Sequence, residues 1–347
     1  MGISPHLSRA YELARSHHPH PNPRVGAVVV SPDGRVLGEG AHEGPGKPHA
    51  EVAALDAAGS VRGATVYVSL EPCSHVGNTP ACADRLVADG VARVVVGATD
   101  PDPRVSGAGI SRLRSAGIDV DVVEDPAARA VDAAYFHHRE TGLPLVTIKY
   151  AMTLDGSAAA RDASSQWITS KEARADAHAL RAESDAVVVG AGTLAGDDPA
   201  LDVRLPGYEG PQPRPVVVAG TGELATGARL WRRDPLVLST RELAIPSGTL
   251  VVVDGGEHPD PVEACRALAG LGLISVLLEG GPTIAAGWWQ AGVVSRGVVY
   301  IGGRVGGGTG MQPLNGVFST IDDATDVVIT GARALGPDVR IDFELEP

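Results

Sequence analysis

Residues 71–82 read EPCSHVGNTPAC, and residues 49–51 read HAE. These two segments offer one imidazole, that of His49, and two thiols, those of Cys73 and Cys82. One His and two Cys form a ligand set suited to zinc. Three protein ligands leave a fourth position for water, as in catalytic rather than structural zinc sites. The pattern therefore predicts a catalytic metal site around which the first half of the chain is organised.

Glu51 follows the predicted histidine ligand by two residues and has a role that does not involve binding the metal. Its carboxylate can take a proton from zinc-bound water and pass it to a leaving amine. Zinc base deaminases combine His-x-Glu with Pro-Cys-x-x-Cys, whereas eight residues separate Cys73 and Cys82 here. Two cysteines in a chain of three are often only buried apolar residues, but both halves of the zinc pattern occur in order. We therefore predict a zinc-dependent deaminase.

The composition limits the classes of protein to which the chain can belong. Its 347 residues suggest about two domains. Its net charge of −13 argues against nucleic acid as a partner, because binding to phosphates needs a basic surface. Three cysteines are too few for a disulfide framework. We find neither a signal peptide after Met1 nor an apolar run long enough to cross a membrane, so we expect a cytoplasmic protein without a membrane partner.

The predicted strands of the first half carry polar residues at their carboxyl ends. Ligands bind at that edge of open α/β sheets. The strand expected at 65–70 is followed by Cys73, and the strand expected at 93–98 by Asp100 and Asp102. An alternative for the two aspartates is that they only stabilise a turn. We expect further strands at 25–30 and 35–40 and helices at about 4–18, 49–58, 82–89 and 127–139.

The second half restarts with a strand at 146–152, after a short linker at 141–144. Strands and helices then alternate as far as a terminal strand near 339–343, which predicts an α/β domain with a mostly parallel sheet. The glycines of LEGGPT at 278–283 could admit a phosphate to a helix N-terminus, although a bare tight turn is at least as consistent with them. No Gly-x-Gly-x-x-Gly motif follows the first strand of this half, so a Rossmann dinucleotide fold is not supported.

Taken together, the motifs resemble those of one family, the bifunctional deaminase–reductases of riboflavin biosynthesis. They run in order through nearly the whole chain: PNP at 21–23, HAE at 49–51, EPCSHVGNTPAC at 71–82, LDG at 154–156, SQWIT at 165–169, DDP at 197–199 and EGGPT at 279–283. The spacing of the two cysteines is itself this family's pattern. The resemblance implies a cytidine-deaminase-like three-layer α/β/α domain at 1–145 and a dihydrofolate-reductase-like α/β domain at 146–347.

The resemblance also implies two reactions on one small phosphorylated pyrimidine. The first is the zinc-dependent hydrolytic deamination of 2,5-diamino-6-(5-phosphoribosylamino)pyrimidin-4(3H)-one, and the second is the NADPH-dependent reduction of its ribosyl group to a ribityl chain. One Zn²⁺ per chain would be held by His49, Cys73 and Cys82, with Glu51 as the catalytic residue. The deaminase substrate would contact Asn22, His42, His75, Asn78, Asp100 and Asp102.

For the reductase, the family pattern implies two sets of contacts. NADPH would contact Ala151, Trp167, Thr193, Asp197, Gly220, Gly281, Pro282, Thr283, Ile284, Ala285, Ala286 and Gly287, and the substrate would contact Ser165, Arg181, Leu201, Arg204 and Glu279. Arg181 and Arg204 would by default be solvated surface residues, but guanidinium forks match phosphate oxygens. Members of this family would also be expected to form homo-oligomers, either dimers or tetramers.

Two departures from the family pattern concern charge. Many relatives have a Lys or Arg where Asn78 stands, and Asn is common where Asp102 stands. Both changes make the deaminase pocket less positive. Two other functions also remain open on sequence grounds: a zinc base or nucleoside deaminase with an accessory, non-catalytic C-terminal domain, and a non-catalytic zinc-stabilised binding protein.

Overall fold

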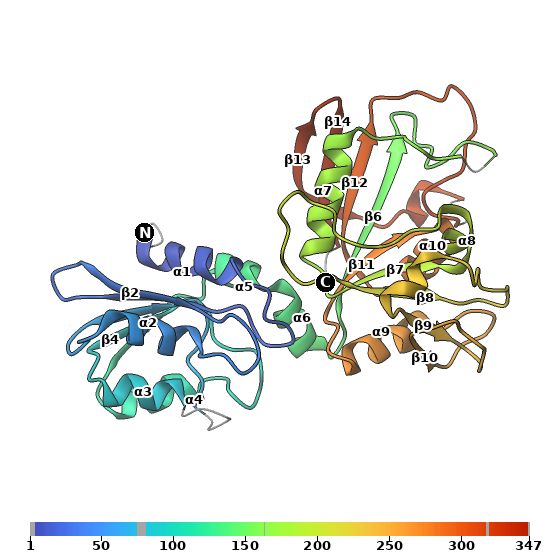
Figure 1. The fold of residues 1–347 in the computed structure, drawn as a ribbon. Coiled ribbons are helices and arrows are strands. Elements are labelled where there is room, and N and C mark those ends of the chain that lie inside the picture. The colour runs from blue at the N-terminus through green and yellow to red at the C-terminus, as the bar shows by residue number, and fades with distance from the viewer. Residues whose placement is uncertain (1–3, 75–80, 163, 317–318, 346–347) are drawn as a thin grey trace. The chain divides into compact units, whose positions relative to one another are not determined.

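The computed structural model describes residues 4–74, 81–162, 164–316 and 319–345. The chain forms two compact units, Met1–Gly142 and Leu143–Pro347 (Figure 1). Each unit has its own sheet and its own buried apolar clusters, so each is described by itself. Among the described helices, none is long and apolar enough to span a membrane.

The first unit is built on a five-stranded sheet with the order β2-β1-β3-β4-β5. Strand β1 is antiparallel to β2 and β3, while β3, β4 and β5 are parallel. Its elements are α1 (Pro5–Arg15), β1 (Gly26–Val30), β2 (Val36–Ala41), α2 (Ala50–Ala58), β3 (Thr65–Val68), α3 (Cys82–Ala88), β4 (Arg93–Val96), α4 (Ala108–Ser115), β5 (Asp119–Val122), α5 (Pro126–Val131) and α6 (Ala133–Thr141).

Helices cover both faces of this sheet. Because successive strand residues point to opposite faces, Val28 and Val30 pack with Ala10 of α1, whereas Ala27 and Val29 belong to the core formed with α2, α3 and α4. The result is the three-layer α/β/α arrangement that the family resemblance implies.

Two glycines of β2 allow α2 to lie unusually close to the sheet. A Cβ atom at Gly40 would come within 2.4 Å of the Ala50 carbonyl oxygen, and one at Gly38 within 2.4 Å of the Ala54 carbonyl oxygen. Any side chain at these positions would push the helix away from the strands. The glycines therefore fix the position of the N-terminus of α2, where His49 and Glu51 lie.

The second unit is built on a nine-stranded sheet with the order β10-β9-β8-β7-β11-β6-β12-β14-β13. The first seven strands of this order are parallel, and β14 and β13 are antiparallel additions. Its elements are β6 (Leu145–Thr153), α7 (Lys171–Ala182), β7 (Ala186–Gly190), α8 (Ala191–Asp197), β8 (Arg214–Val218), η1 (Arg229–Arg233), β9 (Leu236–Ser239), β10 (Thr249–Val252), α9 (Pro261–Gly270), β11 (Ser275–Gly280), α10 (Pro282–Gln290), β12 (Val294–Gly302), η2 (Ile321–Asp323), β13 (Val327–Leu335) and β14 (Asp338–Leu345).

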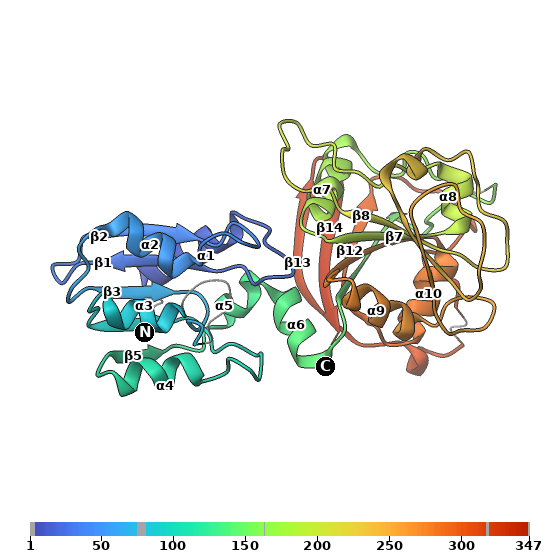
Figure 2. The same cartoon turned by 60° about the horizontal axis from the view of Figure 1, so that its bottom comes forward.

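Two apolar clusters lie on opposite faces of the larger sheet. One contains Leu268 of α9 and Trp288 of α10, and Figure 2 shows these two helices on the same side of the strands. The other contains Leu194 of α8 and Leu230 of η1. The mostly parallel sheet expected from the alternation of strands and helices is confirmed.

The structure differs from the sequence-based expectations in one predicted helix and in three elements that were not predicted. The single helix expected at 127–139 is wrong, because α5 and α6 are separated at Asp132, whose carboxylate accepts the Tyr135 N–H at the start of α6. Helix α4 and strand β5 were not expected. Helix α8 was not expected either, since its AGTLAGD sequence gives only a glycine-rich pattern.

Candidate active sites

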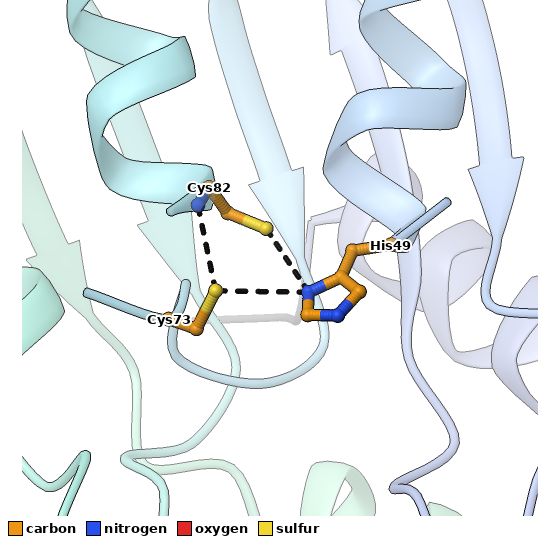
Figure 3. A group of neighbouring side chains, drawn as sticks. All are labelled: His49, Cys73 and Cys82. Atoms are coloured by element: carbon orange, nitrogen blue, oxygen red, sulfur yellow. Dashed lines mark hydrogen bonds between the residues drawn. The ribbon is translucent and has the colours of Figure 1, made fainter. Parts of the chain in front are cut away.

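The predicted metal ligands come together in the first unit (Figure 3). His49 is the N-cap residue of α2, Cys73 follows β3, and Cys82 is the first residue of α3. The His49 Nδ1 atom lies 3.2 Å from Cys82 Sγ and 3.6 Å from Cys73 Sγ. The Ala83 N–H donates to the Cys73 carbonyl oxygen, which ties the loop after β3 to α3.

The donor set of this cluster fits zinc. One imidazole nitrogen and two sulfurs lie within 4.8 Å of one another, and in the described part of the chain no fourth His, Cys, Asp or Glu completes the group. Hydrogen bonds from Cys82 and His49 lower the pKa of Cys73 to about 4 despite its burial. A thiolate is the form that binds metal, so the cluster provides the anionic sulfur that a zinc site needs.

Glu51 is buried in the first turn of α2, with 3% of its surface exposed. Burial, followed by the charge of Cys73, raises the pKa of Glu51 to about 7. It stands beside the metal ligands but is not a member of their group. A carboxyl group with these properties can accept and return a proton near neutral pH.

Asn22 and His42 lie beside the same cluster. The His42 Nδ1–H donates to the Pro48 carbonyl oxygen at 3.0 Å, which leaves Nε2 to accept from Asn22 Nδ2 at 3.1 Å. The His42 and His49 rings meet edge to face with centroids 5.3 Å apart. Burial lowers the pKa of His42, so a neutral imidazole stands next to the metal ligand.

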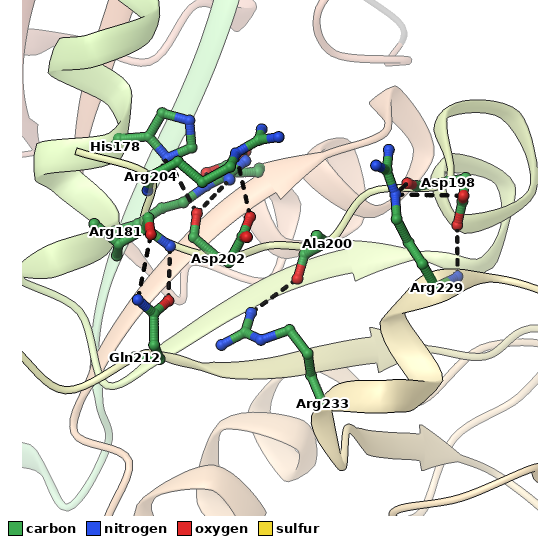
Figure 4. Close-up of polar contacts among 11 residues, drawn as sticks. His178, Arg181, Asp198, Ala200, Asp202, Arg204, Gln212, Arg229 and Arg233 are labelled. Carbon is green, nitrogen blue, oxygen red and sulfur yellow. Dashed lines mark hydrogen bonds and ion pairs between the residues drawn. The ribbon is translucent and has the colours of Figure 1, made fainter. Parts of the chain in front are cut away.

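In the second unit, a partly buried ion pair joins α7 to β11. Arg181 donates from Nε and Nη2 to the two carboxylate oxygens of Glu279, at 2.6 and 2.8 Å. Arg181 Nη1 donates to the Asp202 carbonyl oxygen, and Arg204 Nε lies 3.4 Å from Asp202 Oδ1 (Figure 4). Both arginines expected to bind phosphate therefore already have acidic or carbonyl partners.

A glycine junction lies between β11 and α10. Gly281 is the N-cap residue of α10, and a Cβ atom there would lie 3.1 Å from Thr193 Oγ1. Ile284 packs against Gly190, where a Cβ atom would lie 2.7 Å from its side chain. Segments 190–193 and 281–284, which the family pattern assigns to NADPH, thus lie side by side at the ends of two neighbouring parallel strands, β7 and β11.

A pocket of about 670 Å³ opens beside the segment that follows β6. Its lining includes Ser165 and Trp167, which the family pattern assigns to substrate and to NADPH, together with residues 304–306 after β12. Its volume lies in the range of small-molecule sites.

Comparisons with known proteins agree with this geometry. The family model of the cytidine and deoxycytidylate deaminase zinc-binding region matches residues 3–98, and that of the RibD C-terminal domain matches residues 144–341. The chain is 41% identical to the riboflavin biosynthesis protein RibD of Chlamydia muridarum, over 93% of this chain and 91% of that protein. It is 37% identical to RibD of Escherichia coli K12, over 96% and 97%.

The chain belongs to the RibD family. A solved RibD structure from Acinetobacter baumannii has a TM-score of 0.91 at 32% identity and covers 99% of this chain and 98% of its own. Membership in the RibD family makes this protein a bifunctional enzyme of riboflavin biosynthesis, with a zinc-dependent deaminase and an NADPH-dependent reductase. The alternative of an accessory, non-catalytic C-terminal domain is not favoured.

The remaining RibD pattern residues are spread over several environments. His75 and Asn78 lie outside the described residues. Ala151 is on β6, and Asp197 ends α8. Leu201 is buried in the apolar core, and Gly220 is packed against the His258 ring, 2.4 Å from where its Cβ atom would be. On α10, Ala285 and Ala286 are buried while Pro282, Thr283 and Gly287 are less so.

The two aspartates after β4 are buried and paired. Asp100 accepts from the Tyr135 hydroxyl at 3.1 Å. Asp102 accepts from Arg104 Nη2 at 2.6 Å and lies 3.5 Å from Arg139 Nε. Hydrogen bonding to Arg104 outweighs partial burial and lowers the pKa of Asp102. The negative charge of Asp102 is thus matched by two guanidinium groups.

Sequence reasoning missed the structural role of Glu71. Its buried carboxylate accepts the N–H groups of Gly107 and Gly109 at 2.9 Å, that of Ile110 at 3.2 Å and that of Asp100 at 3.3 Å. It therefore ties the end of β3 to the start of α4 and the loop after β4. The signal in the sequence was a glutamate next to Pro-Cys, but its partners are backbone groups that no pattern reveals.

We expect Glu71→Ala to lower the free energy of unfolding of the first unit by about 3 kcal/mol, because several buried N–H groups lose their acceptor. The first 142 residues contain no tryptophan, so urea-induced zinc release should be followed instead of fluorescence. Glu71→Gln, which keeps one acceptor oxygen, should lose less. Equal zinc-release midpoints for Glu71→Ala and the unchanged protein would contradict this role.

Lys149 on β6 was also missed as a charge partner of Glu279. Burial acts to raise the pKa of Glu279, but the charges of Arg181 and then Lys149, with the hydrogen bonds from Arg181, outweigh it and lower the pKa to about 2. The signal in the sequence was a lysine within an otherwise apolar strand, KYAM at 149–152.

This shift predicts how the stability of the second unit depends on pH. The unfolded pKa of Glu is about 4.3, so the ion pair contributes roughly 3 kcal/mol above that pH. The contribution is lost as the pH falls toward 2, the folded-state pKa of Glu279. Urea unfolding followed by tryptophan fluorescence should show that Glu279→Gln removes part of the pH dependence between pH values of about 4.3 and 2. The control Glu263→Gln, which changes a glutamate at the surface whose side chain is 37% exposed, should keep it. Identical pH profiles for both variants would refute the assignment.

Proposed function

We propose that the deaminase acts on 2,5-diamino-6-(5-phosphoribosylamino)pyrimidin-4(3H)-one and that the reductase acts on its deaminated product. The observation that carries this proposal is the convergence of His49, Cys73 and Cys82 beside a buried, uncoordinated Glu51. Support comes from a Thermotoga maritima structure described as a diaminohydroxyphosphoribosylaminopyrimidine deaminase/5-amino-6-(5-phosphoribosylamino)uracil reductase, with a TM-score of 0.91 at 31% identity over 98% of each chain.

The two activities divide near residue 145, with the deaminase at 1–145 and the reductase at 146–347. The compact units meet at Gly142 and Leu143, and the match to the RibD C-terminal domain begins at residue 144. All the groups required for the first reaction lie before this boundary. Lys149, Arg181 and Glu279 lie after it.

His49, Cys73 and Cys82 would hold the zinc ion, which would supply a Lewis acid that lowers the pKa of water. Glu51 would accept the proton of the attacking water and later give it to the amino group that leaves. A carbon–oxygen bond forms at the amino-bearing ring carbon, its carbon–nitrogen bond breaks, and ammonia departs. Asn22 and His42, fixed by their mutual hydrogen bond and by Pro48, orient the pyrimidine beside the metal ligands.

In the second reaction, segments 190–193 and 281–287 would hold NADPH, which would supply the hydride that is added to C1′ of the ribosyl group. A proton is taken up by the ring oxygen, so that the sugar opens to a ribityl chain. Glu279, Arg181 and Lys149 form a partly buried polar group that holds the substrate hydroxyl groups. Segments 190–193 and 281–287 provide the glycine junction at which the cofactor binds.

Two assays on the same preparation test this proposal. Ammonia should be released from the diamino substrate, and NADPH absorbance should then fall only when the deaminated product is present. His49→Ala should abolish the first reaction but leave the second intact when the deaminated intermediate is supplied. Ammonia release from cytidine but not from the diamino substrate would show that the proposed substrate is wrong.

We further propose a cytoplasmic homo-oligomer, a dimer or a tetramer, that binds neither membranes nor nucleic acid. The cysteines of the chain are free thiols, which suits a reducing compartment. Edge strand β13 exposes Val327, Val328 and Ile329, and contiguous exposed apolar side chains are typical of interfaces. Light scattering after size exclusion should give twice or four times the monomer mass, and a monomer at micromolar concentration would refute this part.

A further inference from the structure

The Tyr300 side chain lies beside Lys149 on the face of the larger sheet that α7 covers (Figure 1). Strands β6 and β12 pair with Lys149 opposite Val298 and Ala151 opposite Tyr300, so these four side chains share one face. Val298 and Tyr300 pack there with Ala173 of α7. The Lys149 Nζ atom is 5.9 Å from the centroid of the Tyr300 ring, which is within the reach of about 6 Å of a cation–π contact.

The Tyr300 ring is buried and is fixed at its hydroxyl group. The hydroxyl donates to Asp176 Oδ2 of α7 at 2.6 Å. Burial and then this hydrogen bond raise the pKa of Tyr300, so the phenol stays neutral and continues to donate. A hydrogen bond to a carboxylate increases the electron density of the phenol ring, which strengthens its attraction for a cation.

The Asp176 carboxylate is itself held by the C-terminal hairpin. Arg340 Nη1 of β14 donates to Oδ2 at 2.6 Å, and Arg333 Nη2 of β13 donates to Oδ1 at 2.6 Å. The side chains of Asp176 and Arg340 are only 15% and 14% exposed. Asp176 therefore cannot readily turn away from Tyr300, and the orientation of the ring is determined by three elements that pack together.

The Lys149 ammonium group has little else to hold it. Among the described residues, no hydrogen bond or ion pair involves Lys149 Nζ. Glu279 follows Leu278 of β11, which pairs with Ile148 of β6, and the charge of Lys149 helps to lower the pKa of Glu279. Because a lysine side chain is long and flexible, its ammonium group stays near Glu279 only if a neighbour restricts it.

We propose that Tyr300 and Asp176 are positioning residues of the reductase. Asp176 holds the Tyr300 ring, and the ring holds the Lys149 ammonium group beside Glu279. This inference rests on the proposed function, in which Lys149 and Glu279 hold the hydroxyl groups of the substrate. The family pattern gives no role to Tyr300 or Asp176.

The kinetic test removes the ring in Tyr300→Leu. We expect kcat/KM for the deaminated intermediate to fall by about tenfold, as loss of a partly desolvated cation–π contact implies, while the KM for NADPH changes less than twofold. Tyr300→Phe and Asp176→Asn keep the ring and weaken only its anchor, so each should lose about threefold. They also serve if the leucine variant does not fold.

The matched control is Phe343→Leu, which removes a buried ring from the core on the other face of the same sheet. It should lower the free energy of unfolding but keep kcat/KM. A second comparison uses Lys149→Met, in which a further Tyr300→Leu change should have no additional effect on kcat/KM. Full additivity of the two changes, or a kcat/KM of Tyr300→Leu equal to that of Phe343→Leu, would overturn the inference.

Nuclear magnetic resonance provides a readout that does not need turnover. The chain has three lysines, Lys47, Lys149 and Lys171, so ¹³C labelling at lysine Cε gives a simple spectrum in which Lys149→Met assigns one signal. Its protons should lie upfield of those of Lys171, which is 84% exposed, and Tyr300→Leu should abolish this difference. Equal positions in the unchanged protein and Tyr300→Leu would overturn the inference. An upfield Lys149 signal in a protein that does not reduce the deaminated intermediate would instead refute the proposed function.

Discussion

Glu51→Gln should reduce ammonia release by roughly 10²–10⁴-fold, the usual contribution of a positioned proton carrier. The amide has nearly the shape of the buried carboxyl group but cannot accept the proton of the attacking water. Because Glu51 is not a member of the ligand group, zinc analysis should still give about one ion per chain. Reduction of the deaminated intermediate should proceed at the unchanged rate.

The matched control for this change is Glu12→Gln on α1, where the carboxylate is exposed and pairs with Arg9 at the surface. It should leave both activities unaltered. If the Glu51→Gln protein keeps more than a tenth of the deaminase activity, Glu51 is not the proton carrier of the reaction. One that loses its zinc would show instead that Glu51 supports the metal.

Cys82→Ala should remove both the metal and the deaminase activity. The remaining imidazole and thiol are too few ligands for a stable zinc site, and without the metal no water is activated. The reductase should remain, because the two units have separate cores. All four tryptophans belong to residues 167–289, so the unfolding transition followed by fluorescence should not move.

Cys265→Ala is the matched control, because Cys265 lies in the apolar core of the second unit. It should keep one zinc and the deaminase activity, and it should lower the free energy of unfolding of the second unit slightly. The two cysteine variants thus report on different units. Zinc retention and full ammonia release by Cys82→Ala would contradict the ligand assignment.

Much of the fold could be predicted from the sequence because its strands are strongly patterned. Runs such as GAVVV in β1 and AVVVG in β7 are buried on both faces, which makes them easy to recognise. Edge strand β5 has the sequence DVDV, and its aspartates pair with Arg93 on β4. Charged residues are common on edge strands. The alternating aspartates that made β5 hard to recognise in the sequence therefore follow from its position at the edge of the sheet.

The metal centre could be predicted because zinc chemistry requires particular side chains. Hydrogen-bonding partners could not be predicted in this way. Glu71 binds backbone N–H groups nearly forty residues away in sequence. Asp132 both separates α5 from α6 and accepts the Arg24 N–H from a distant loop. Such contacts depend on tertiary geometry rather than on residue spacing.

The positions of Arg181 and Glu279 also required the structure. The sequence indicates that each could contact the substrate, but it does not show that they bind each other. Their pairing changes the expected chemistry, because a guanidinium group already held by a carboxylate is less available to phosphate.

X-ray absorption at the zinc edge tests the central claim most directly. We expect two sulfur ligands at about 2.3 Å, one imidazole nitrogen and one light atom from solvent, which a substrate analogue should displace. It follows from the convergence of His49, Cys73 and Cys82. A spectrum showing four protein ligands, or a purified active deaminase that contains no zinc, would contradict the account.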